Sequence, residues 1–234
     1  MAATKRLFVT SVEAFAADPL SPIRRVDALG DADNIRYEPE SGRIYVGFDS
    51  ALAVLEGSTM RLMSRIKLSG HPESFQLESR GSRIFVNVPT AHRIAVIDRK
   101  QGEVRSSWSL GEARANFPMA LDEASHRLFV ATRRPAALLV FDTESGKRIT
   151  SVPIGGDADD LFFDGERKQI LAICGEGLIT VVHQQDADRY VAIDQVHTAP
   201  GARTGLFVPA QRTLYVAVPA QHSSQAEIRL FTVK

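Results

Sequence analysis

The chain has 234 residues, and its 28 lysines and arginines balance 28 aspartates and glutamates, so the formal net charge is zero. This balance argues against nucleic acid or an anionic membrane surface as a partner, because both need a basic stripe. No apolar segment approaches the length that crosses a bilayer, and the single cysteine, Cys174, cannot form an internal disulfide. The length suits one large all-β domain over residues 1–234.

The N-terminal segment superficially resembles a targeting sequence, because the basic stretch MAATKR precedes an apolar one. Glu13 interrupts the apolar stretch, and RLFVTS from Arg6 matches a strand motif that recurs along the chain. We therefore interpret the segment as a structural strand. The sequence specifies no cellular compartment.

A short motif of alternating character recurs along the chain. It reads RIYV, RIFV, RLFV, QILA and TLYV, and its copies begin at positions 43, 83, 127, 169 and 213. Further apolar runs and turn residues such as Ser145-Gly146-Lys147 follow the copies, which favours strands joined by hairpins over helices. Successive copies begin 40, 44, 42 and 44 residues apart. A repeat of this length with four strands per unit indicates the blades of a β-propeller.

The period divides the chain into six blade positions, approximately 1–30, 31–70, 71–112, 113–156, 157–200 and 201–234. The first blade has no recognisable first strand, and its predicted strands are Arg6–Ser11, Val12–Phe15 and Ile23–Leu29. The second and third blades have predicted strands at Ile35–Tyr37, Arg43–Phe48, Ala51–Leu55, Met63–Leu68, Phe75–Leu77, Arg83–Val88, Arg93–Asp98 and Val104–Leu110.

The fourth blade, from Phe117 to Gly156, contains four short apolar runs. The fifth has predicted strands at Leu161–Phe163, Gln169–Cys174, Leu178–Val182 and Tyr190–His197. The sixth, with Leu206–Val208, Thr213–Val218 and Glu227–Val233, lacks an outer strand. Cys174 falls in an apolar run and is predicted to be a buried small hydrophobe.

These patterns predict an all-β fold, a β-propeller of four-stranded antiparallel blades with about six blade positions and incomplete first and last blades. An imperfect seam between those two blades is expected. The alternative is a remnant of a seven-bladed propeller. A third outcome is a homodimer that pairs its unpaired blade edges, since an open edge invites another chain.

The second to fourth blades contain RIYVGFDSALAVLE, RIFVNVPTAHRIAVIDRKQGEV and RLFVATRRPAALLVFDTESGKRI. These segments resemble the YVTN-type β-propeller repeat family of bacteria, and the resemblance extends from about Gly30 to the C-terminus. It implies a propeller that is often exported and whose ligand is often unknown. It implies no catalytic residues, because the family motif is one of packing and turns.

In a propeller, the segments that lead into the first strands gather around one mouth of the central channel, which is the default binding site. We aligned these segments on Tyr37, Leu77, Leu121, Phe163 and Val208. Four residues earlier stand Asp33, Glu73, Phe117, Asp159 and Thr204, so three blades place a carboxylate at the same height. Two residues earlier again stand Asp31, His71, Ala115, Asp157 and Ala202, and a period of two would put each pair on one strand face.

The predicted ligand-binding residues of this mouth are Asp33, Asn34, His71, Glu73, Arg114, Asn116, Asp159, Asp160 and Arg203. One interpretation is an acidic rim that holds a hard cation such as calcium, or a polar ligand between acids and arginines. The other is that these residues cap backbone groups in their own turns. Arg133 and Arg134 are expected to be exposed loop arginines, and the alternative is that they attract an anion.

No motif for hydrolase, nucleotide or zinc chemistry is present: the sequence lacks G-x-S-x-G, G-x-x-x-x-G-K-[ST], H-E-x-x-H and C-x-x-C. The first functional hypothesis is a non-enzymatic scaffold that binds a small polar ligand or a protein partner at the channel mouth and needs no cofactor. The alternative is a propeller enzyme of the lactonase or quinoprotein-dehydrogenase type, in which a calcium ion at the mouth polarises the substrate or orients a cofactor.

Overall fold

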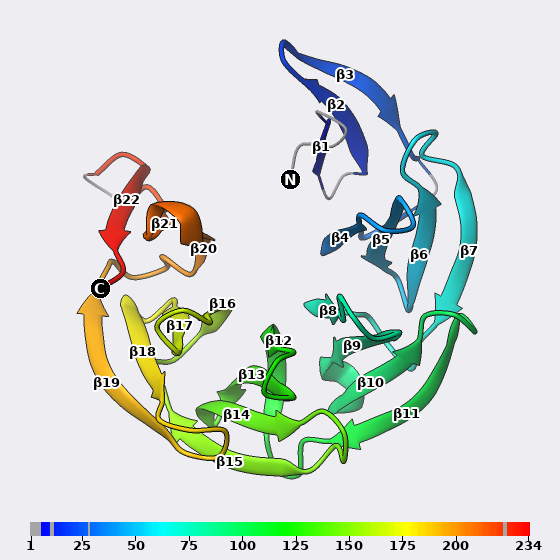
Figure 1. Cartoon of the computed structure of the whole chain (residues 1–234). Coiled ribbons are helices and arrows are strands. Elements are labelled where there is room, and N and C mark those ends of the chain that lie inside the picture. Colours follow the sequence, from blue (N-terminus) through cyan, green and yellow to red (C-terminus); the bar gives the residue numbers. More distant parts are fainter. Residues whose placement is uncertain (1–5, 10–11, 28, 222–223) are drawn as a thin grey trace. The chain divides into compact units, whose positions relative to one another are not determined.

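The computed structural model describes residues 6–9, 12–27, 29–221 and 224–234, and these residues are mostly β-strand (Figure 1). They form six antiparallel sheets, of which four have four strands and two have three. The fold is that of a β-propeller, as the sequence predicted. The chain divides into two compact units, Met1–Ser109 and Leu110–Lys234. No described helix has the length and apolar character needed to span a membrane.

Unit 1 contains three sheets, and in each sheet every strand pairs with its neighbour in sequence. The first sheet is β1 (Arg6–Val9), β2 (Glu13–Ala17) and β3 (Leu20–Arg25). The second is β4 (Ile35–Glu38), β5 (Arg43–Phe48), β6 (Ala51–Glu56) and β7 (Leu62–Lys67). The third is β8 (Phe75–Leu77), β9 (Arg83–Val88), β10 (Arg93–Asp98) and β11 (Glu103–Ser109), with the 3-10 turn η1 (Pro89–Ala91) between β9 and β10.

Unit 2 repeats this arrangement in three further sheets. The first is β12 (Arg114–Asp122), β13 (Arg127–Arg134), β14 (Ala136–Asp142) and β15 (Arg148–Pro153). The second is β16 (Ala158–Asp164), β17 (Gln169–Cys174), β18 (Leu178–Gln184) and β19 (Tyr190–His197). The third is β20 (Thr204–Val208), β21 (Thr213–Val218) and β22 (Glu227–Thr232), with η2 (Pro209–Gln211) between β20 and β21.

The sheets pack face to face within each unit, and this packing explains the apolar pattern of the strands. The second strands β5 and β9 are buried from their second residue onward, and in β5 this is because neighbouring sheets of unit 1 cover both of its faces. The fourth strand β11 is mostly exposed. In unit 1, β4 adjoins β8 and β7 adjoins β11. First strands therefore meet first strands, and last strands meet last strands, which is the packing of propeller blades.

Apolar side chains from adjacent sheets form the core of each unit. In unit 1, Tyr45 and Leu52 of one sheet pack with Phe75 and Ile84 of the next. In unit 2, Phe129 anchors the corresponding cluster, and its ring lies 5.2 Å from that of Phe163. Burial of these apolar groups between sheets, at roughly 25 cal/mol per Å², is the main force that holds neighbouring blades together.

The predicted strands agree closely with the observed ones outside the first blade. Strands β8, β9, β10, β17, β19 and β21 have the predicted bounds. In the first blade, the predicted strand Ile23–Leu29 is wrong in position, because β3 starts at Leu20 and ends at Arg25. Residues 10 and 11 of the predicted Arg6–Ser11 strand, and residue 28, lie outside the described part. The single domain and the seam remain predictions.

Cys174 is buried at the end of β17, as the sequence predicted, and burial raises the pKa of its thiol from 9.0 to about 11. We expect the native protein to react slowly with a thiol reagent even at pH 9, where only about 1% of such a thiol is ionised. The rate of reaction with 5,5'-dithiobis(2-nitrobenzoate), measured with and without urea, checks this. A native rate equal to that of the unfolded chain would contradict it.

Candidate functional site

Two equivalent segments lead into β4 and β8 in unit 1, and the same backbone hydrogen bonds hold both. The N–H of Asp33 donates to the carbonyl of Gly47 at 2.9 Å, and Gly47 donates back to Asn34 at 2.9 Å. In the next sheet, the N–H of Glu73 donates to Asn87 at 2.9 Å, and Asn87 donates back to the following residue at 3.0 Å. Asp33 and Glu73 thus occupy the same position on neighbouring sheets, as the alignment predicted.

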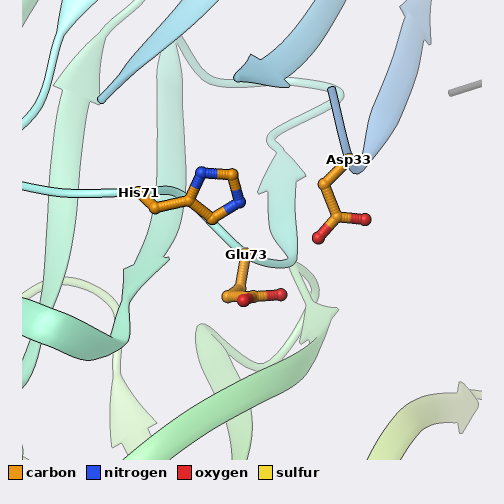
Figure 2. Close-up of side chains that lie close together, drawn as sticks. All are labelled: Asp33, His71 and Glu73. Atoms are coloured by element: carbon orange, nitrogen blue, oxygen red, sulfur yellow. The ribbon is translucent and has the colours of Figure 1, made fainter. Parts of the chain in front are cut away.

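The side chains of Asp33, His71 and Glu73 lie together, and we call this set the Asp–His–Glu cluster (Figure 2). One carboxylate or imidazole atom of each residue lies within 4.8 Å of the others, and all three residues are half-buried. Two carboxylates beside an imidazole provide donor atoms of the kinds that bind divalent cations. The cluster joins residues that are far apart in sequence, because the first strands of two sheets adjoin.

A hydrogen bond to the neighbouring loop orients the His71 ring. Nδ1 lies 2.9 Å from the carbonyl oxygen of Asp49 and 3.6 Å from a carboxylate oxygen of Asp31. The Nδ1–H therefore donates to Asp49, which leaves the lone pair on Nε2. Figure 2 shows the ring nitrogen farther from the backbone turned toward the side of Asp33.

In unit 2, four charged side chains from three sheets form one network, which we call the Arg–Asp quartet: Arg133, Asp157, Asp159 and Arg203. Arg133 contacts Asp157 at 3.1 Å and Asp159 at 2.6 Å. Arg203 contacts the same two carboxylates at 2.7 Å and 3.3 Å. The arginines offset the repulsion between the two aspartates, and each aspartate bridges both guanidinium groups.

The quartet is ordered but reachable from solvent. The guanidinium of Arg133 stacks over the Phe117 ring at 4.1 Å, which holds it in place. The Arg203 side chain is 44% exposed. The hydrogen bond to Asp157, followed by the charges of Asp159 and Asp157, raises the pKa of Arg203.

The other predicted site residues contact backbone or lie in the interior. The Asp160 carboxylate accepts the N–H of Gly205 at 2.8 Å, which ties β16 to β20. Arg114 donates to the carbonyls of Gly111 and Ala113 at 2.7 and 2.8 Å. Asn116 is fully buried in β12. The carbonyl of Asn34 accepts the N–H of Gly47 in β5. The bonds of Asp160 and Arg114 are those expected of residues that brace backbone. A ligand-binding role for these four remains a prediction.

The expected alternation of side chains holds only in part. Strands β4 and β8 start after Asp33 and Glu73, and Asp31 and Asp157 have left-handed backbone with φ of 51° and 58°. In β16 the register shifts between Ala158 and Asp160, so Asp159 lies at an irregularity. Asp157 and Asp159 nevertheless reach the same two arginines.

Sequence reasoning missed two members of this site. Arg133 was expected to be an exposed loop arginine, but it lies in β13 and is the centre of the quartet. Phe117 was counted as an apolar member of the rim, and it is the ring on which Arg133 stacks. No local signal marks either role, since each depends on which residues the neighbouring segments bring close.

Comparison with known proteins places the chain near bacterial proteins named YncE. It is 25% identical over 187 residues to YncE of Salmonella typhimurium, covering 78% of this chain and 52% of that protein. It is 29% identical over 138 residues to YncE of Escherichia coli O157:H7, covering 57% of this chain and 37% of that protein. The chain thus spans about half or less of the length of these relatives. No family model matches it.

Solved structures support the fold. One, titled Kuenenia stuttgartiensis Hydrazine Synthase, superposes with a TM-score of 0.73 at 12% identity, covering 88% of this chain and 64% of that one. Another, titled Crystal Structure of Mitotic Checkpoint Complex, gives a TM-score of 0.79 at 12% identity, covering 97% and 70%. At this identity the likeness concerns the fold alone, and it agrees with a propeller.

Proposed function

We propose that this chain is a non-enzymatic propeller scaffold that binds a carboxylate-rich segment of a partner protein through the Arg–Asp quartet. The proposal depends on one observation: Arg133, near the end of β13, and Arg203, just before β20, are held in a fixed arrangement, and part of each remains exposed. Guanidinium groups suit carboxylates because their N–H donors form a planar fork. Preorganisation lowers the entropy that is lost on binding.

The aspartates of the quartet also set its selectivity. Asp157 and Asp159 neutralise the two arginines in the absence of a partner, so an incoming acidic group must compete with them. A single carboxylate gains little from this exchange, whereas a segment with several carboxylates engages both guanidinium groups at once. The scaffold would therefore select partner segments by the density of their negative charge and not by one contact.

A fluorescein-labelled glutamate-rich peptide is the probe for this proposal, with anisotropy as the measurement. We expect saturable binding that weakens with added salt, and a loss of at least about tenfold in affinity when Arg133 and Arg203 are both replaced by methionine. Arg203→Met alone should give an intermediate loss. Arg189→Met is the matched control, because Arg189 is an exposed arginine that pairs only locally with Asp186 among the described residues.

Two outcomes of this experiment count against a binding function of the quartet. One is the absence of binding to the wild-type chain at any salt concentration. The other is equal binding by the wild type and by a double variant whose circular dichroism shows it to be folded. A conserved spectrum separates lost binding from lost structure.

The repeats are assigned as part of this proposal to the YVTN type. Support comes from RIFVNVPTAHRIAVIDRKQGEV, which spans β9, η1 and β10 and enters β11, and from RLFVATRRPAALLVFDTESGKRI, which forms β13, β14 and the start of β15. The motif ends in each case at the hairpin between the third and fourth strands. There Asp98 accepts the N–H of Lys100, and Asp142 accepts that of Ser145. The aspartate of the motif thus caps a turn.

The second candidate is a propeller enzyme that uses a cation, and the Asp–His–Glu cluster favours it. Incubation of the protein and Zn²⁺ or Ca²⁺ with lactone substrates distinguishes the two candidates. If the chain is a scaffold, wild type and Asp33→Asn give the same rate of lactone hydrolysis. If it is an enzyme, the rate is lower with Asp33→Asn than with wild type.

A further inference from the structure

The geometry points to a binding site for one divalent transition-metal ion, Zn²⁺ being the best match, at the Asp–His–Glu cluster. The inference is independent of the proposed scaffold function, since it concerns residues of unit 1 and not the quartet of unit 2; the second candidate, an enzyme that uses a cation, would depend on this site. Three donor groups of two chemical kinds converge there from the segments before β4 and β8, within 4.8 Å of one another.

The orientation of His71 is the second observation that favours a metal. Metal-binding histidines commonly donate their other ring N–H to a carbonyl or carboxylate, which fixes the tautomer and the ring plane. His71 already makes this contact: Nδ1 is 2.9 Å from the Asp49 carbonyl, and Asp31 lies on the same side at 3.6 Å. Nε2 is therefore left as the donor, and it faces the side where Asp33 lies (Figure 2).

The close approach of the two sheets supports the same assignment. Pro72 separates His71 from Glu73 and packs against Gly47 of β5. A Cβ at Gly47 would lie 3.2 Å from Cγ of Pro72, which is tighter than ordinary packing, and 3.5 Å from the carbonyl oxygen of Pro72, which is an ordinary contact. Glycine at this position thus lets the His71–Glu73 segment lie beside Asp33.

The set of donors favours zinc over calcium. Calcium takes six to eight oxygen ligands, whereas this cluster offers one imidazole and two carboxylates. Zinc accepts three such protein ligands with water in the remaining position, at bonds of about 2.0–2.2 Å. Donors around tetrahedral zinc lie about 3.4 Å apart, so small side-chain rotations suffice to close the cluster from its present spacing.

The Asp33 carboxylate is available to bind the metal ion. Among the residues that the structure describes, none donates a hydrogen bond to its carboxylate or pairs with it in a salt bridge. By contrast, the Asp157 and Asp159 carboxylates of unit 2 are already neutralised by two arginines. Carboxylates alone therefore do not distinguish the two clusters; the imidazole of His71 and the unneutralised carboxylate of Asp33 do.

The test is isothermal titration of tag-free protein with Zn²⁺ and, separately, with Ca²⁺. We expect one Zn²⁺ per chain with micromolar affinity, and a loss of at least about tenfold in affinity for His71→Gln, Asp33→Asn and Glu73→Gln. Co²⁺ should give visible absorption bands that disappear in His71→Gln. His92→Asn is the matched control, since His92 is exposed with left-handed backbone, which asparagine tolerates.

A further variant tests the placement without removing a donor. Gly47→Ala should weaken Zn²⁺ binding, because the added methyl displaces Pro72 and with it the two donors that flank it. The site would be overturned if wild-type protein bound no Zn²⁺ at millimolar concentration, or if a folded His71→Gln variant bound it as tightly as wild type. Tighter binding of Ca²⁺ than of Zn²⁺ would overturn the choice of ion.

Discussion

Replacing Arg127 by methionine is expected to lower the free energy of unfolding of unit 2 by about 3 kcal/mol, the lower end of the range for breaking a buried ion pair. Arg127 starts β13, and its side chain is 10% exposed. It donates to Asp142 at 2.7 Å within its own sheet. It also donates to Asp188 at 2.7 Å and to the Ala187 carbonyl at 2.8 Å in the neighbouring sheet. Methionine fills similar space but donates none of these bonds, so among the described residues the Asp142 carboxylate keeps only the bonds from Ser145 and the Ala187 carbonyl only the one from Tyr190.

Urea denaturation of the wild type, Arg127→Met and Arg189→Met measures this effect. Arg189 belongs to the same loop as Asp188, but its side chain is 75% exposed, so its loss should cost no more than about 0.5 kcal/mol. Equal costs for the two variants would show that burial of Arg127 contributes nothing specific.

The cost of losing Arg127 should also depend on pH. Hydrogen bonds from Ser145, together with the charge of Arg127, lower the pKa of Asp142. A carboxyl whose pKa is lowered in the folded state contributes stability above its unfolded pKa of about 3.9, and this contribution is lost as the pH falls further. The difference between wild type and Arg127→Met should therefore shrink below about pH 4.

Replacing Phe129 by alanine is expected to cost about 3 to 5 kcal/mol, the typical range for a fully buried phenylalanine. Phe129 of β13 has no exposed surface and belongs to the core between two sheets of unit 2. Its ring contacts those of Phe163 at 5.2 Å and Tyr190 at 5.7 Å. The substitution leaves a cavity and removes both ring contacts.

The midpoint of urea unfolding should fall in Phe129→Ala, with the m-value unchanged. Ile193→Ala is a suitable control, because Ile193 is 53% exposed on β19. It should cost well under half as much. A cost of less than about 1 kcal/mol for Phe129→Ala would mean that this cluster does not hold the two sheets together.

Much of the candidate site was predictable as a set of residues but not as a set of contacts. The alignment of leading segments placed Asp33 and Glu73 at one height, and the matching backbone bonds to Gly47 and Asn87 confirm this. It also assigned Asp157 and Asp159 to a common face, and the side chains of both residues reach Arg133. It did not reveal that Arg133 and Arg203 neutralise these acids while His71 approaches Asp33 and Glu73.

The sequence by itself determined the strands, the hairpins and the propeller class, because each depends on local features: apolar alternation, turn residues and a repeated period. Strands such as β9 and β21 match their predicted bounds for this reason. Only the tertiary structure decided which charges meet. Asp33 and His71, or Arg133 and Arg203, come close through the packing of whole sheets and through irregular backbone at Asp157 and Asp159, and neither leaves a periodic signal in the chain.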